Sequence, residues 1–239
     1  MLALSRALLL CHRLPLAFGS PYDRCMELLD ELLKQAEVAH GHLCAGQVLG
    51  VRMAMLGCRR LRIEDPRGAD RKRLVTYIEI DRCATDAIGV VTGCRLGKRA
   101  LKFRDWGKMA ATFVDLGTGR AIRIVALESS KQRARELYPV IENKNQQQMK
   151  AYREMDDGEL FGEQWVDVEL GPKEMPGYKG ERVTCADCGE GINYERFVER
   201  GGEKLCLACA RPEQRYYRPA SGEPVREAVA DSGSKCECG

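Results

Sequence analysis

The sequence has no long apolar run and no large excess of charge of one sign, and each absence excludes a class of protein. A membrane-spanning helix needs about 20 consecutive, mostly apolar residues, and no segment approaches that length. The 38 basic and 35 acidic residues leave a net charge of +3, whereas a dedicated nucleic-acid-binding domain is strongly basic. We therefore expect no membrane partner, and we do not expect nucleic acid to be the main partner.

A complete phosphate-binding loop is also absent. Only three residues separate Gly93 from Gly97, and Lys98 is followed by Arg99 instead of the Ser or Thr that would hold Mg²⁺. ATP binding is therefore not predicted. The basic residues in and after this segment form either a solvated surface, which we favour, or a face for an anion or an acidic partner: Arg95, Lys98, Arg99, Lys102 and Arg104.

Four of the 12 cysteines have the spacing C-x2-C-x17-C-x2-C near the C-terminus: Cys185, Cys188, Cys206 and Cys209. This spacing is typical of a structural zinc site, in which four thiolates surround the ion and leave no open position for catalysis. A module of about 30 residues cannot bury enough apolar surface to fold alone, so zinc supplies much of its folding free energy. Paired thiols at this spacing favour a reducing compartment, and we expect the protein in the cytoplasm.

The residues around these cysteines resemble the treble-clef zinc finger of the TraR/DksA family. The resemblance rests on residues 185–192, on Arg196 and on the second cysteine pair, and it covers the finger alone. In that family a helical coiled coil with an acidic tip reaches into RNA polymerase, and no earlier segment of this chain resembles such a coil. We therefore interpret the finger as a borrowed module and not as a sign of transcription control.

The composition divides the chain into five parts. The first residues are apolar and have no acidic side chain before Asp23, which fits a loose arm, a non-native start, or a weak signal or transit peptide. A Gly- and Pro-rich stretch precedes the finger, and a polar, Pro-containing segment follows it. The predicted parts are an N-terminal arm or non-native start at residues 1–21, an α+β core at 22–170, a linker at 171–182, the zinc finger at 183–211 and a disordered tail at 212–239.

Apolar periodicity predicts the helices of the core. Helical spacing occurs at residues 22–39, 84–91 and 130–157, the last bent or broken near Pro139. A further helix is expected after Cys44, and the small residues Gly46, Gly50 and Ala54 recur along it at intervals of four. Such a stripe lets a second backbone approach closely.

Alternating and branched residues predict the strands. They occur at residues 74–80, at 108–116 and 120–127 on either side of a Gly-Thr-Gly turn, and at 165–170. The two central runs are expected to pair antiparallel. Helices followed by strands, a hairpin and another helix predict an α+β fold, with an antiparallel or mixed sheet against packed helices.

A second group of residues that could bind a metal lies in the core, at the ends of predicted elements: His42, Cys44, Cys83, Asp86 and Cys94. Cys44 and Cys83 both precede helical runs, and the positive end of a helix lowers the pKa of a thiol. A His/Cys/Cys set suits Zn²⁺ and related transition metals and leaves a position for water or a partner's group. Spacing alone is equally compatible with ordinary buried cysteines in a core.

The core resembles the family of the E-subunit of formylmethanofuran dehydrogenase. The resemblance rests on residues 40–46, 81–88, 92–98 and 105–108, in that order, within residues 22–170. Some members also carry a C-terminal zinc finger. The resemblance implies an α+β core, commonly dimeric, with a metal-binding groove. It further implies His42, Cys44 and Cys83 as ligands, with Asp86 and Cys94 as neighbours that ligate the metal or orient its ligands.

Two residues depart from the family pattern. Ala45 follows Cys44 where many relatives have proline, and Arg95 stands where a small hydroxyl residue is usual. The second difference adds a long cation near the expected groove.

Our first functional hypothesis is a cytoplasmic, homodimeric metal-binding accessory protein. The family resemblance links it to formylmethanofuran dehydrogenase or to molybdenum and tungsten enzyme metabolism, as a non-catalytic subunit or partner. Its expected cofactors are a structural Zn²⁺ in the finger and a second transition metal, taken as Zn²⁺, in the core. Two alternatives remain open: a small metal- or thiol-dependent enzyme that uses the core groove, and a regulatory protein that binds nucleic acid or RNA polymerase through its finger.

Overall fold

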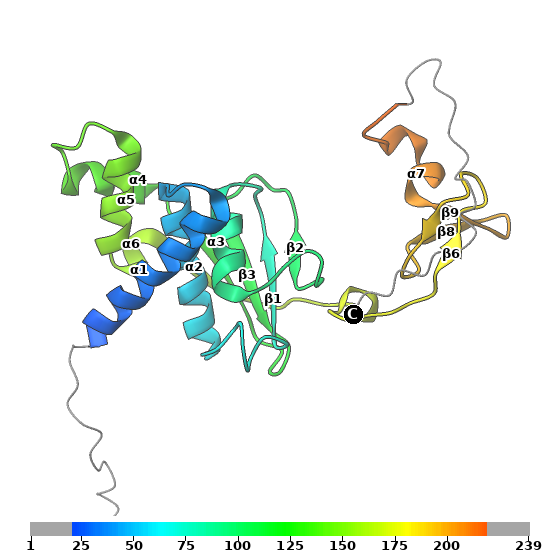
Figure 1. Cartoon of the computed structure of the whole chain (residues 1–239), viewed down its shortest axis with the longest axis horizontal. Helices are drawn as coiled ribbons and strands as arrows, with labels where there is room; N and C mark the ends of the chain where they lie inside the picture. Colours follow the sequence, from blue (N-terminus) through cyan, green and yellow to red (C-terminus); the bar gives the residue numbers. More distant parts are fainter. Residues whose placement is uncertain (1–20, 219–239) are drawn as a thin grey trace, which may run out of the picture. The chain divides into compact units, whose positions relative to one another are not determined.

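The computed structural model describes residues 21–218, with side chains from Leu28 onward. The expectations for residues 1–20 and 219–239 lie outside this range. The chain forms two compact units, one extending to Gly177 and the other starting at Tyr178, and each is described by itself (Figure 1). Within the described residues, no helix combines the length and the apolarity needed to cross a bilayer.

The N-terminal unit is built on one open sheet of five strands. Their order across the sheet is β2 (Leu101–Phe103), β1 (Leu74–Ile78), β3 (Ala110–Asp115), β4 (Ala121–Ala126) and β5 (Phe161–Val166). The β1–β2 pair is parallel and the other three pairs are antiparallel. The mixed sheet confirms the predicted α+β class, and the hairpin expected between residues 108 and 127 is the β3–β4 pair.

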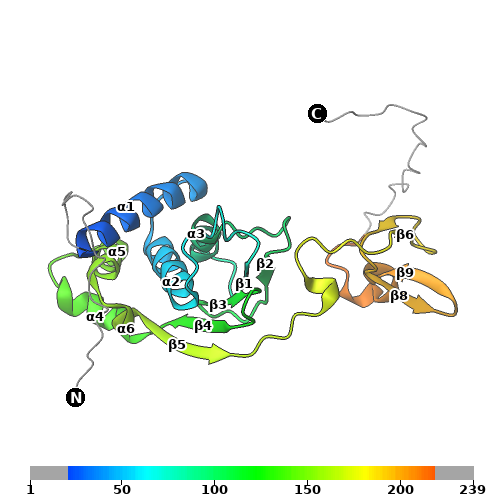
Figure 2. The ribbon, with the colours of Figure 1, turned by 90° about the horizontal axis from the view of Figure 1, so that it is seen from below.

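Helices cover one face of this sheet (Figure 2). The helices over the face are α1 (Pro21–His40), α2 (Ala45–Leu61) and α3 (Cys83–Thr92), and between β4 and β5 the chain forms α4 (Ser129–Leu137), α5 (Lys144–Glu154) and α6 (Asp157–Leu160). The sheet side chains that face these helices are apolar and buried, among them Leu74, Ile78, Phe113, Ile122 and Ile124. They pack on buried residues of α2 such as Val48, Val51 and Leu56 to form the main core.

Helix α2 lies at the centre of the unit because small residues let its neighbours come close. A Cβ atom on Gly50 would lie 2.5 Å from the carbonyl oxygen of Ala84 in α3. On the sheet side, a Cβ on Gly57 would lie 2.4 Å from the ring of Phe113. The close backbone approach expected from the small-residue stripe therefore occurs, and α3 is the element that makes it.

The observed elements differ from the predicted ones at three places. The long helix expected at 130–157 is broken, because Pro139 lies between α4 and α5, and Asn143 caps α5 by accepting the Gln146 N–H at 3.0 Å. Strand β5 starts four residues before the expected 165, because its exposed edge positions carry polar residues that hide the alternation. Strand β2 has only three residues, too few to produce a pattern in the sequence.

Residues 167–176 cross the face of the sheet that the helices leave uncovered. Val168 and Leu170 pack against a small apolar cluster of Val75, Val114 and Ala121. Further along, Lys102 donates a hydrogen bond of 2.5 Å to the Glu174 carbonyl oxygen, and Arg104 forms a 3.3 Å ion pair with the Glu174 carboxylate. The first part of the segment expected to be a linker, residues 171–177, therefore belongs to the N-terminal unit.

The C-terminal unit consists of two short hairpins and a turn of helix. Strand β6 (Val183–Thr184) pairs with β7 (Gly191–Ile192), and β8 (Phe197–Arg200) pairs with β9 (Glu203–Cys206). The four-residue helix α7 (Leu207–Ala210) follows β9, and the 3₁₀ turn η2 (Pro212–Gln214) comes next.

The Gly50 contact gives a direct test of the α2–α3 packing. Gly50→Ala should lower the free energy of unfolding by about 1–3 kcal/mol, because the new methyl group meets rigid backbone and the helices must separate. Urea denaturation would measure the change. Gly158→Ala in α6 is the matched control, since its added Cβ meets nothing within 4 Å; equal stability of the two variants would contradict the packing described.

Candidate metal centres

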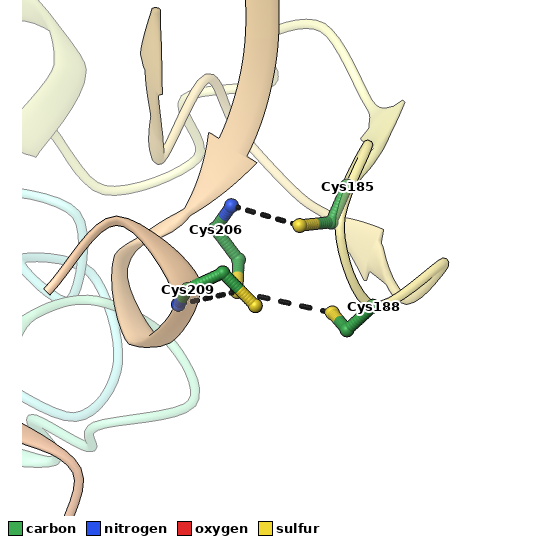
Figure 3. Close-up of side chains that lie close together, drawn as sticks. All are labelled: Cys185, Cys188, Cys206 and Cys209. Carbon is green, nitrogen blue, oxygen red and sulfur yellow. Dashed lines mark hydrogen bonds between the residues drawn. The ribbon is translucent and has the colours of Figure 1, made fainter. Parts of the chain in front are cut away.

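The four cysteines of the C-terminal unit converge on one point. Cys185 and Cys188 come from the turn between β6 and β7, and Cys206 and Cys209 come from the end of β9 and the start of α7 (Figure 3). Their sulfur atoms all lie within 4.8 Å of one another. This is the arrangement needed for four thiolates around a tetrahedral Zn²⁺.

Hydrogen bonds to the sulfur atoms support the same assignment. The backbone N–H of Cys206 donates to the Cys185 sulfur at 3.2 Å, and that of Cys209 donates to the Cys206 sulfur at 3.3 Å. The Arg215 guanidinium lies 3.2 Å from the Cys209 sulfur. Backbone N–H groups of Cys188 and Cys206 lower the pKa of Cys185 to about 6. These donors stabilise negative charge on sulfur, which is the form that binds zinc.

The C-terminal unit has little else to hold it together. Apart from Cys185, its only buried apolar residues in the described part of the chain are Ile192 and Ala210. Asp187 raises the pKa of Cys209, and burial and the three other thiols raise it further. Four crowded sulfurs therefore need a cation to become thiolates, and the donor set fits Zn²⁺.

Removing one finger ligand should unfold the C-terminal unit and leave the N-terminal unit intact. Cys188→Ser is the suitable change, because this cysteine is exposed and its loss creates no cavity. In amide NMR spectra, we expect the signals of residues 178–218 to collapse to the narrow range of an unfolded chain. Ala186→Ser in the same turn is the control; a dispersed finger spectrum in the Cys188 variant would show that zinc is not its main support.

A second cluster lies where α1 gives way to α2. One ligand atom from each of His40, His42 and Cys44 lies within 4.8 Å of the others. His40 is the last residue of α1, Gly41 adopts a φ of +95°, and Cys44 is the N-cap of α2. The positive φ turns the chain sharply, so the two imidazoles come together with ring centroids 4.9 Å apart.

Cys83 reaches the same place from another part of the chain. It is the first residue of α3, and its Cβ lies 3.3 Å from the position of a Cβ built on Gly46, which in turn would lie 3.7 Å from the Cys44 sulfur. Burial raises the pKa of the Cys83 thiol, and the nearby Cys44 raises it further. The lower pKa that we expected for Cys83 at a helix N-terminus is therefore wrong, because desolvation and a second sulfur outweigh the helix dipole.

Asp86 lies one helical turn after Cys83 and contacts this cluster through His40. Its carboxylate is 2.8 Å from Nδ1 of His40. A carboxylate that accepts the N–H of one ring nitrogen leaves the other nitrogen, Nε2, for a metal. The structure thus gives Asp86 the orienting role and adds His40, which sequence reasoning had not placed among the ligands. The His-x-His pattern just before Cys44 was the signal for it.

Cys94 does not join this cluster. It lies beyond the C-terminal end of α3, whereas Cys83 lies at the start of the same ten-residue helix. A helix of this length separates its ends by about 15 Å. The Cys94 thiol is buried in the core instead, between the Thr76 hydroxyl and the Leu74 carbonyl oxygen, at 3.5 Å from each.

Comparisons with known proteins identify both parts of the chain. The family described as "FmdE, Molybdenum formylmethanofuran dehydrogenase operon" matches residues 39–162, and the prokaryotic dksA/traR C4-type zinc finger matches residues 178–215. The first match covers more than half of the chain and includes His40, His42, Cys44 and Cys83. The chain belongs to the FmdE family and carries a C-terminal zinc finger, so both predicted resemblances are confirmed.

Two relatives extend this comparison. A curated protein of Archaeoglobus fulgidus, named "Probable S-adenosyl-L-methionine-binding protein", is 30% identical over 200 residues, which are 76% of this chain and 53% of the relative. The chain thus spans about half the length of that curated relative. The crystal structure of an FmdE-like protein of tungsten formylmethanofuran dehydrogenase from Syntrophus aciditrophicus has a TM-score of 0.55 and 21% identity, covering 78% of this chain and 94% of that one. This second similarity supports the fold.

Proposed function

We propose that this protein is a metal-binding accessory protein linked to formylmethanofuran dehydrogenase or to molybdenum and tungsten enzyme metabolism. One observation carries the proposal: His40, His42 and Cys44 lie together at the start of α2, with Cys83 beside them at the start of α3. The family's description and the name of the solved relative both include formylmethanofuran dehydrogenase, which supports the link to that enzyme.

The donor set fits a transition metal. Two imidazoles and two thiols are the ligand types that Zn²⁺ and its neighbours prefer, whereas Mg²⁺ and Ca²⁺ prefer oxygen. Cys44 and Cys83 stand at the N-terminal ends of two helices, where the helix dipoles favour negative sulfur. The metal would replace the thiol protons, and its charge would relieve the repulsion between two adjacent thiolates.

The accessibility of the cluster fits a role in metal handling or in contact with a partner. His42 is exposed, while His40, Cys44 and Cys83 are half-buried. If His42, Cys44 and Cys83 are the ligands, as the family resemblance implied, the fourth position is open to water or to a partner's group. If His40 also binds, the site closes with four protein ligands. The Asp86–His40 contact is compatible with either arrangement.

The number of bound metal ions tests the proposal. A variant with all four finger cysteines changed to serine should retain one metal equivalent per chain, because the N-terminal unit folds on its own core. Adding His42→Ala and Cys44→Ser should remove that equivalent. Elemental analysis of the purified full chain would measure both.

Cys94→Ala in the finger-null background is the matched control for the loss of a thiol. This control should keep the metal, since Cys94 lies away from the cluster. Complete loss of metal on removing the finger cysteines alone would mean that the core holds none, and the proposed function would then fail.

Asp86→Asn tests the role of the orienting carboxylate. The amide cannot support His40 as an anion does, so metal affinity at the core site should fall by about 10- to 100-fold while the stoichiometry at saturation stays the same. Competition with a chromophoric chelator would give the affinity. Asp81→Asn, an exposed carboxylate just before α3, is the control and should leave the affinity unchanged.

The other expectations stay predictions. We propose a homodimer in the cytoplasm and a treble-clef geometry for the finger. Light scattering coupled to size-exclusion chromatography would give the oligomeric state.

A further inference from the structure

A cavity of about 840 Å³ opens on the N-terminal unit, away from both groups of metal ligands. Two loops border it: residues 66–72, which follow α2, and residues 93–98, which follow α3. Its floor is apolar and comes from Leu74, Ala100, Leu116 and Met175. The last of these belongs to the segment that crosses the open face of the sheet.

The charged residues around this cavity are all cations. Five basic side chains line it, and no Asp or Glu does: Arg67, Arg71, Lys72, Arg95 and Lys98. Where hydrogen bonds of these five are observed, the acceptors are uncharged. Arg71 donates to the Gly68 carbonyl oxygen at 3.1 Å, Arg95 is 3.5 Å from that of Cys94, and Arg67 donates to the side-chain amide of Gln35. Within residues 21–218, none of the five forms an ion pair with a carboxylate.

Tertiary structure gathers these cations, because two glycines let the loops approach. Gly93 has a φ of +68°, and a Cβ there would lie 3.2 Å from Cγ of Arg67. A Cβ on Gly89 in α3 would lie 2.6 Å from Nη1 of Arg95, so this guanidinium rests against the helix. Like charges held close together repel unless an anion joins them.

The basic run of the sequence therefore divides into two groups. Lys102 and Arg104 contact Glu174 of the crossing segment, as described above. Arg95 and Lys98 face the cavity, together with the three cations of the 66–72 loop. The interpretation of the whole run as a solvated surface is thus incomplete.

We propose that this cavity binds a small molecule that carries phosphate, with two or more negative charges, on an apolar body. Guanidinium groups pair with phosphate oxygens through parallel, charge-assisted hydrogen bonds, and lysines add point charge. The aliphatic floor accommodates the remainder of the molecule. The site is independent of the metal cluster, because α3 separates Cys83 at one of its ends from Gly93 at the other.

A small molecule fits these observations better than a nucleic acid. The cations enclose one cavity instead of following a groove, and the chain as a whole has a net charge of only +3. The lining contains no aromatic side chain on which bases could stack.

A series of simple anions tests the proposal on the full chain. Isothermal titration would compare inorganic phosphate, pyrophosphate, hexyl phosphate and uncharged hexanol. Pyrophosphate should bind about tenfold more tightly than phosphate because it engages more cations. Hexyl phosphate should exceed phosphate by a similar factor because its chain covers the floor, and hexanol should not bind measurably.

A double variant locates the binding. Arg95→Gln with Lys98→Gln should weaken pyrophosphate binding at least about tenfold. Arg135→Gln with Lys144→Gln removes the same charge from exposed positions on α4 and α5, and it should change the affinity less than twofold. All four side chains are exposed, so both variants should fold, which circular dichroism would check.

Amide NMR of the unaltered chain gives a second, mutation-independent readout. Pyrophosphate should shift the signals of residues 66–74 and 93–100. The proposal is overturned if no anion binds at millimolar concentration, if both double variants lose affinity equally, or if the shifted signals lie elsewhere. It is also overturned if single-stranded RNA displaces pyrophosphate and binds with a steep dependence on salt, since the cations would then serve a nucleic acid.

Discussion

The backbone contact between α2 and α3 is the constraint on which the N-terminal unit depends. Gly50 brings the second helix so close that no side chain fits between it and Ala84. Because the crossing lies near the start of both helices, their first residues are also neighbours, and Cys44 and Cys83 meet across Gly46. The same contact keeps α2 buried between α3 and the sheet, so packing and ligand geometry have one cause.

The electrostatics of the cluster follow from this arrangement. Two helix N-termini point at one place and favour anions. Burial and the presence of a second sulfur act in the opposite direction and keep the Cys83 thiol protonated. A bound transition metal reverses this balance, since its charge stabilises both thiolates. Asp86, one turn along α3, adds a carboxylate that orients His40 without occupying the metal. An arrangement of this kind is better suited to holding a metal than to presenting a single reactive thiol.

Helix α3 links two sites of opposite character. Its N-terminal end carries soft metal ligands and the Asp86 carboxylate, and its C-terminal end leads into the cationic cavity. The segment at residues 167–176 completes the cavity from the other face of the sheet and takes up part of the positive charge of β2 through Glu174. Each end of this ten-residue helix thus faces a different kind of ligand, although the two sites share no side chain.

The sequence by itself determined what depends on near neighbours. Apolar periodicity predicted α1 and α3 to within one or two residues, and the C-x2-C pairs predicted the finger, because a turn or a helix is specified by residues a few positions apart. Only the tertiary structure decided what depends on distant contacts. It brought His40 to Asp86, placed Cys94 in the core far from Cys83, and divided the basic run between Glu174 and a cavity. These outcomes follow from the crossing of helices and strands that are far apart in the chain, and residue spacing carries no information about such a crossing.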